Sequence, residues 1–247
     1  MELSNMALIG NGAQADVYLF ENKAIKVFKH EHLQANACHE AELQNKARKA
    51  GLPVPAILEV IELDGRTAIV MEYIEGTPLG SMMLEDMENA HYYLAIAADM
   101  QMSVHSITAD GFPHQNDKLK NNICNTPILE AAQKQKLLQL LQNMGTDHRL
   151  CHGDFHVFNL IQTTRNIKII DWVDASSGSI SADVCRSYLL YLLYRSEIAE
   201  VYLEMYCHKA NMLKQDVLRW LPVIAGARLN ENVSKQDIPM LLRMVDA

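Results

Sequence analysis

The sequence has 247 residues, 49% hydrophobic and 21% charged, a balance that excludes disordered, collagen-like and disulfide-scaffold proteins. It carries 22 Lys and Arg against 30 Asp and Glu, a net charge of −8, which argues against nucleic acid as a partner. The five cysteines are scattered and form no C-x-x-C pair, as is typical of reduced thiols. We find no signal peptide and no apolar run of membrane-spanning length, so we expect a cytoplasmic protein without a membrane partner.

The first quarter of the chain predicts strands around one helix. Apolar runs that read as strands occupy residues 6–9, 17–20, 24–28, 57–62 and 66–73. Residues 34–50 have helical spacing and stop at Gly51, with Pro53 just beyond. Hairpin turns are predicted at residues 21–23 and at Asp64-Gly65. The expected order is therefore strand, strand, strand, helix, strand, strand.

A different pattern follows the glycine- and proline-rich residues 76–80, where we place a boundary between lobes 1–75 and 76–247. Helices are predicted at residues 89–106, 128–143, 182–194, 198–209 and 215–229. One small hairpin interrupts them, with strands at 160–162 and 167–170 about a polar turn.

The stretch His152-Gly153-Asp154-Phe155-His156-Val157-Phe158-Asn159, followed by the hairpin and Asp171-Trp172, is the strongest chemical signal. An antiparallel hairpin brings its open ends together, so Asn159 and Asp171 should lie side by side. An amide oxygen beside a carboxylate suits Mg²⁺. Asp154 lies five residues before Asn159, in the loop leading to the same place. His-Gly-Asp alone would indicate only an Asx-capped loop.

The sequence HGDFHVFNLI…IIDW resembles the HGDxHxxN…IDW motif of the aminoglycoside phosphotransferase and choline kinase family. That resemblance implies a bilobal α+β fold of protein-kinase type. Its N-terminal lobe would hold a five-stranded antiparallel sheet with one helix and bind nucleotide. Its C-terminal lobe would be mostly helical, with the catalytic hairpin and the acceptor site. By the same resemblance Asp154 is the catalytic base or orienting carboxylate, and Asn159 and Asp171 are Mg²⁺ ligands.

Gly10-x-Gly12-x-x-Ala15 follows a predicted strand and precedes another, which argues against a Rossmann turn, since that turn opens a helix. The context fits a glycine-rich hairpin over nucleotide phosphates, with Gly10 and Gly12 as binding residues. Ala15 replaces the third glycine of such a loop. A tight turn without ligand is the alternative interpretation.

Lys26 stands inside the apolar strand 24–28, and a buried ammonium is costly unless it is paired. A kinase would pair this lysine with nucleotide phosphates and with a glutamate on the following helix. Glu40 and Glu42 are the candidates, and the resemblance favours Glu40. The alternative is a lysine that extends to the strand edge to reach water.

The strand ending at residues 70–76 looks like a kinase hinge, which holds a purine through backbone groups. The expected contacts are the backbones of Glu72 and Ile74, with Met71 behind the ring. ATP is the expected donor, and GTP stays the alternative because backbone groups can bind either purine. The alternative interpretation of this segment is an ordinary strand end without a ligand.

His105 and Asp183 resemble family positions for which we expect structural roles.

Only eleven residues separate Asp171 from Asp183, which leaves no room for the long activation segment of an ordinary protein kinase. This favours a small-molecule hydroxyl as acceptor. Two acidic features would suit a cationic acceptor of aminoglycoside or choline type. Positions 67–117 contain acidic residues but no Lys or Arg, and one helical face carries Glu197, Glu200 and Glu204. The alternative is that both are simply solvated faces. The alternative functions are a small Rio-like protein kinase and a nucleotide-binding module without turnover.

Overall fold

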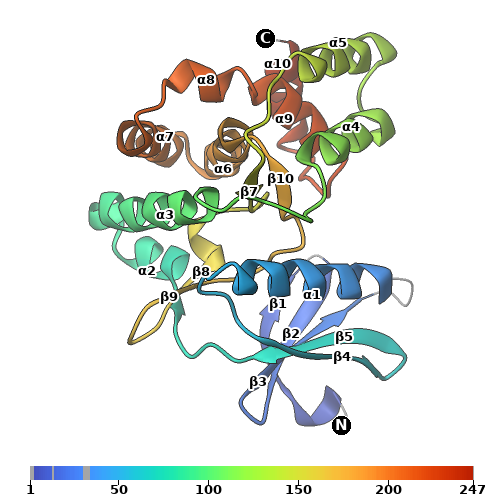
Figure 1. The fold of residues 1–247 in the computed structure, drawn as a ribbon, viewed down its shortest axis with the longest axis vertical. Helices are drawn as coiled ribbons and strands as arrows, with labels where there is room; N and C mark the ends of the chain where they lie inside the picture. Colours follow the sequence, from blue (N-terminus) through green and yellow to red (C-terminus); the bar gives the residue numbers. More distant parts are fainter. Residues whose placement is uncertain (1–2, 13, 30–33, 247) are drawn as a thin grey trace. The chain divides into compact units, whose positions relative to one another are not determined.

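The computed structural model describes residues 3–12, 14–29 and 34–246. It divides into two compact units, Met1–Met82 with Phe158–Asp174, and Met83–Val157 with Ala175–Ala247 (Figure 1). Among the described residues, no helix combines the length and the apolar composition that crossing a membrane requires.

This division differs from the predicted boundary after residue 75, because the small hairpin joins the first unit. Strand β6 (Thr77–Pro78) pairs antiparallel with β8 (Leu160–Gln162), and β8 pairs with β9 (Ile167–Ile169). The backbone N–H of Ile169 also donates to the carbonyl of Pro53, at 2.9 Å. Backbone hydrogen bonds therefore tie the hairpin to the chain around the sheet.

The first unit contains the predicted five-stranded antiparallel sheet. Its strands are β1 (Ala7–Asn11), β2 (Ala15–Phe20), β3 (Lys23–Phe28), β4 (Ile57–Leu63) and β5 (Arg66–Glu72). The spatial order is β1-β2-β3-β5-β4, with every neighbouring pair antiparallel. Positive φ angles at Glu21 and Asn22, and at Asp64 and Gly65, fit the two predicted tight hairpin turns.

Strand β1 runs two residues further than predicted, through Gly10 to Asn11. The pairing continues after a bulge, with Gly10 opposite Val17, and the Asn11 side-chain amide donates to the Asp16 carboxylate at 2.8 Å. Gly12 then donates its N–H to the carbonyl of Ala15 at 2.9 Å. Position 13 of the predicted glycine-rich turn lies outside the described residues.

Alternation along β3 gives its two faces different partners, because successive strand residues point to opposite sides of a sheet. Ile25 and Val27 belong to a buried cluster on one face. Phe28 belongs to the cluster on the other face, together with Ala37 and Ala41 of helix α1 (Gln34–Lys49). The parity of the strand therefore puts Lys26 on the face that α1 covers.

The second unit is mostly helical. Its main helices are α3 (Ala90–His105), α4 (Gln115–Asn125), α5 (Ala131–Gln142), α6 (Ile180–Tyr194), α7 (Ser196–Ala210), α8 (Lys214–Leu218), α9 (Leu221–Arg228) and α10 (Ile238–Asp246). The short elements of the chain are η1 (Leu3–Asn5), α2 (Leu79–Glu85), η3 (Met87–Asn89), η4 (Val157–Asn159), β7 (Arg149–Cys151) and β10 (Ser176–Gly178). Helix α6 is buried along most of its length and contacts α7, α8, α9 and β7. It is therefore the central element of this unit.

One prediction for the second unit is wrong, and some of its elements were not predicted. The single helix expected at 215–229 is two helices, α8 and α9, because Pro222 has no N–H with which to continue the first. Helix α4 was missed because its sequence is polar and rich in asparagine, a poor helix former. Helix α10 was also missed, although its buried Leu241 and Val245 have helical i, i+4 spacing.

The β6–β8 pairing predicts a strict requirement for glycine at position 76. A Cβ on Gly76 would overlap the backbone carbonyl oxygen of Gln162 and lie 2.8 Å from a methyl carbon of Ile161. We expect Gly76→Ala to lower the free energy of unfolding by about 1–3 kcal/mol, measured by urea denaturation. Gly145→Ala is the control, since nothing lies within 4 Å of a Cβ there. Equal stability of the two variants would contradict the packing described here.

Candidate active site

The Lys26 ammonium joins three elements of the first unit. Its Nζ lies 2.6 Å from Oε1 of Glu40 on α1 and 3.0 Å from Oδ1 of Asp171, which follows β9. Of the two candidate partners, the structure places Glu40 on Lys26, while Glu42 pairs with Lys46 one helical turn away at 2.6 Å. Burial alone would lower the pKa of Lys26, but the carboxylates of Asp171 and Glu40 hold that pKa well above its usual value. The lysine is therefore charged and held between two acids.

Asn159 and Asp171 flank the open end of the β8–β9 hairpin, as its antiparallel pairing predicts. Leu160 pairs with Ile169, and the N–H of Ile170 donates to the carbonyl of Asn159 at 3.0 Å. Asp171 adopts a left-handed backbone with φ 64°, and its side chain is 39% exposed. A partly exposed carboxylate and a neighbouring amide residue supply the hard oxygen donors that fit Mg²⁺.

The remaining predicted nucleotide-binding residues also lie in the first unit. Gly10 and Gly12 stand at the β1–β2 connection, and Met71 packs against the sheet cluster that faces α1. Glu72 ends β5 and donates its N–H to the carbonyl of Ala56 at 2.8 Å, so this amide is already committed to a backbone bond. Ile74 follows in irregular chain.

Asp154 belongs to the second unit, where two basic side chains face its carboxylate. Nε2 of His156 lies 3.5 Å from one oxygen, and a guanidinium nitrogen of Arg186 lies 3.6 Å from the other. Burial would raise the pKa of Asp154, but the hydrogen bond from His156 and the charge of Arg186 hold that pKa well below its usual range. The carboxylate is ionised and oriented, as an acceptor of a hydroxyl hydrogen bond must be.

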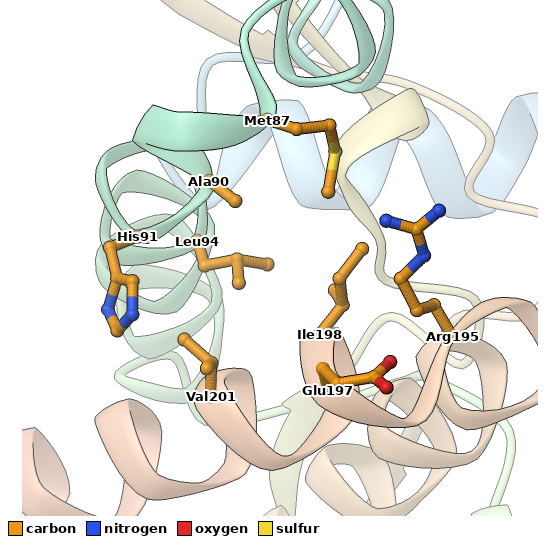
Figure 2. Close-up of a pocket in the computed structure, with 8 residues that line it drawn as sticks. All are labelled: Met87, Ala90, His91, Leu94, Arg195, Glu197, Ile198 and Val201. Carbon is orange, nitrogen blue, oxygen red and sulfur yellow. The ribbon is translucent and has the colours of Figure 1, made fainter.

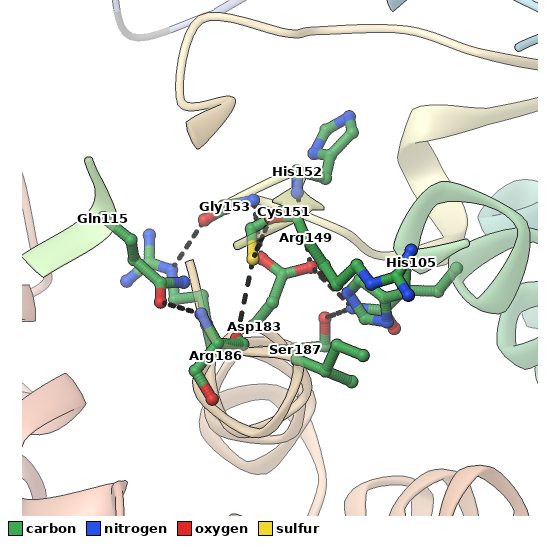
Figure 3. A network of polar contacts seen from close by, with 12 residues as sticks. His105, Gln115, Arg149, Cys151, His152, Gly153, Asp183, Arg186 and Ser187 are labelled. Atoms are coloured by element: carbon green, nitrogen blue, oxygen red, sulfur yellow. Dashed lines mark hydrogen bonds and ion pairs between the residues drawn. The ribbon is translucent and has the colours of Figure 1, made fainter. Parts of the chain in front are cut away.

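The loop that carries Asp154 rests on a buried carboxylate of α6 (Figure 3). Asp183 accepts the backbone N–H of Gly153 at 2.7 Å and that of His152 at 3.3 Å. Its oxygen Oδ2 also lies 2.9 Å from Nε2 of His105 and 3.0 Å from the amide nitrogen of Gln101. Burial opposes ionisation, yet these donors lower the pKa of Asp183 below its usual value. The network therefore fixes the backbone just before Asp154.

His105, Cys151 and Asp183 also lie close enough for their ligand atoms to fall within 4.8 Å of one another. Burial raises the pKa of the Cys151 thiol well above its usual value, which favours the neutral thiol. Both nitrogens of His105 are already used, one by Asp183 and the other by the Tyr206 hydroxyl at 2.6 Å. These contacts favour the structural role expected for His105 and Asp183.

Sequence reasoning missed three residues around Asp154. His156 was left without a role, and Arg186 was overlooked although it stands one helical turn after Asp183 on α6, so the spacing offered a signal. Glu231 pairs with Arg186 at 2.7 Å from a loop beyond α9, and no sequence pattern points to it.

Two cavities of the second unit open between α3 and α7. The first has a volume of about 280 Å³ and is lined by Met87, Ala90, His91, Leu94, Arg195, Glu197, Ile198 and Val201 (Figure 2). The second, of about 570 Å³, shares His91 and Val201 with it and includes Glu204. Glu200 instead accepts a hydrogen bond from Tyr188 at 2.7 Å. Of the three glutamates on the acidic face of α7, Glu197 and Glu204 therefore each line a cavity, and Glu200 contacts helix α6.

A family model described as the phosphotransferase enzyme family matches residues 5–221. The chain belongs to this family. As a member, the protein is a small-molecule phosphotransferase. A comparison with curated proteins found no match.

Solved structures support the fold. A thermostable mutant of aminoglycoside phosphotransferase APH(4)-Ia without ligand is 14% identical, with a TM-score of 0.72 over 98% of this chain and 92% of that one. The gentamicin complex of APH(2″)-IIa is 17% identical, with a TM-score of 0.61 over 98% and 90%. Amicoumacin kinase hAmiN, in complex with AMP-PNP and Ca²⁺, is 13% identical, with a TM-score of 0.64 over 100% and 88%. These likenesses confirm the kinase-like fold that the sequence motifs predicted.

The Asp183 network predicts a pH-dependent stability. Because its pKa is lowered by folding, Asp183 stabilises the native state fully above the unfolded-state pKa of about 3.9, and that contribution is lost as the pH falls below it. We expect Asp183→Asn to cost about 2–4 kcal/mol of unfolding free energy at pH 7, and less on acidification, measured by urea denaturation at several pH values.

Asp99→Asn is the matched control for that experiment. Asp99 pairs with Lys209 on the surface at 2.6 Å, with a side chain that is 60% exposed, so its loss should cost roughly 0–1 kcal/mol. A cost at Asp183 no larger than at Asp99, or one that grows on acidification, would contradict the role given to the buried network.

Proposed function

We propose that the protein transfers the γ-phosphate of ATP, in a Mg²⁺-dependent reaction, to a hydroxyl of a small molecule. The observation that carries the proposal is the Lys26 ammonium, held between Glu40 and Asp171 in a chain of the phosphotransferase enzyme family. A mostly buried lysine with two carboxylate partners is costly to build for stability alone, whereas phosphate recognition needs such an oriented cation.

Each side chain has a defined part in this reaction. Lys26 binds the phosphates under the Gly10–Gly12 turn, and the backbone of the segment 71–74 receives the purine. Asn159 and Asp171 would hold Mg²⁺, which when bound neutralises charge on the transferring phosphoryl group. Asp154 orients the acceptor hydroxyl through a hydrogen bond and takes its proton as the oxygen bonds to phosphorus; its lowered pKa keeps it ionised for the first task and makes it a weak base for the second.

The acceptor in this proposal is small and cationic. The chain between Asp171 and Asp183 is too short to support a peptide in the manner of a protein kinase. Glu197 and Glu204 each line a cavity of the second unit, where they would attract an amine. Hygromycin B and gentamicin accompany the similar solved structures, and we take aminoglycosides as the first class to test.

Asp154→Ala tests the catalytic assignment. We expect kcat to fall by roughly 10²–10⁴-fold, since a general base contributes this much, while ATP affinity stays within about two-fold. ADP release is measured with aminoglycosides, macrolides, choline, ethanolamine, homoserine and simple sugars, and ATP affinity by calorimetry. Unchanged turnover would remove Asp154 from catalysis. Transfer to protein alone would favour a Rio-like kinase, and binding without ADP release a silent module.

Asp171→Asn tests the metal site. Asparagine tolerates the left-handed backbone at this position, so the substitution removes the charge without straining the chain. We expect the gain in ATP affinity that Mg²⁺ provides to fall by roughly 10–100-fold, the equivalent of one lost charged contact. Calorimetric titrations with Mg²⁺ and with a chelator measure it.

Asp64→Asn is the control, because Asp64 has a similar φ of 50° in the β4–β5 turn. The assignment fails if Mg²⁺ strengthens ATP binding equally in the wild type and in Asp171→Asn.

A further inference from the structure

Helix α6 holds the Asp154 loop with two side chains on one face. Asp183 binds the backbone N–H groups of His152 and Gly153, and Arg186 lies one turn later (Figure 3). Nε of Arg186 donates to the carbonyl of Gly153 at 3.2 Å, and its Nη2 lies 3.6 Å from Oδ1 of Asp154. The Arg186 side chain is 9% exposed, so it is fixed by packing as well as by charge.

Glu231 holds Arg186 in this position from a distant part of the chain. Its Oε2 accepts from Nη2 of Arg186 at 2.7 Å and also pairs with Arg228. Burial would raise the pKa of Glu231, but the two arginines lower it, so the carboxylate is charged. Glu231 lies beyond residue 221, where the family match ends. The anchor therefore comes from a part of the chain that the match does not cover.

We infer that Arg186 is a positioning residue for Asp154 and that Glu231 fixes its orientation, which ties the segment after α9 to the catalytic carboxylate. The inference rests on the proposed role of Asp154. A guanidinium has separate donors in one rigid plane, so it can hold the Gly153 carbonyl, Asp154 and Glu231 together. Without the Glu231 carboxylate the guanidinium keeps its bond to the Gly153 carbonyl but loses the charged partner of Nη2, so the direction of the Asp154 carboxylate is less tightly fixed.

Glu231→Gln tests this inference, because it keeps the size of the side chain and removes its charge. We expect kcat to fall by roughly 10–100-fold, as small misplacements of a catalytic group do, with the KM for ATP within about two-fold. ADP release is measured with the best acceptor of the panel, or with water as acceptor. In the Asp154→Ala background the same substitution should cause no further loss, since Arg186 acts through Asp154.

Glu200→Gln is the matched control, because the Glu200 carboxylate accepts a hydrogen bond from Tyr188 of α6, whereas Glu231 accepts from Arg186. If Glu231→Gln does not fold, Arg186→Lys replaces it, since lysine keeps the charge but lacks the planar fork. Turnover of either variant equal to that of Glu200→Gln, in an active enzyme, would overturn the inference alone. A wild-type protein that releases no ADP would overturn the proposed function and this inference with it.

Discussion

The first unit depends on one mostly buried ammonium, with the Lys26 side chain 15% exposed, and on its two carboxylate partners. Alternation along β3 points Lys26 toward α1, where its charge would be costly without compensation. Glu40 supplies one partner from the helix and Asp171 the other from the chain after β9. Sheet, helix and hairpin are thereby joined at one charged atom. Stability alone does not explain such an arrangement, because an apolar side chain at position 26 could fill the same space more cheaply.

The second unit also depends on a charged group with compensating partners, but here the charge is negative. Here the buried charge is the Asp183 carboxylate, and its partners are backbone N–H groups, His105 and Gln101. The donors and the Asp183 carboxylate satisfy one another, which holds the loop before Asp154 in place, with Gly153 at a φ of 81° that glycine adopts readily. The Asp154 carboxylate instead faces two basic side chains, His156 and Arg186, which keep it ionised. The residues that hold the loop backbone are therefore different from the residue that would contact the acceptor.

Local patterns predicted most of the first unit. Strand alternation and two tight turns predicted the sheet, and the antiparallel hairpin predicted that Asn159 and Asp171 flank the same end. The choice of Glu40 over Glu42 came from the family resemblance. The β6–β8 pairing could not be predicted, because a two-residue strand is too short to show an alternation of apolar and polar residues and its partner lies far along the chain. Helix α4 was hidden by its asparagines, and Glu231 by the absence of any local pattern linking it to Arg186.

Identification of the phosphorylated product tests the account most directly. The protein would be incubated with Mg²⁺, ATP and the acceptor panel, and each acceptor followed by mass spectrometry beside the Asp154→Ala variant. The account predicts that an acceptor hydroxyl gains one phosphoryl group with the wild type and none with the variant. Consumption of ATP that yields only inorganic phosphate or phosphorylated protein would contradict it.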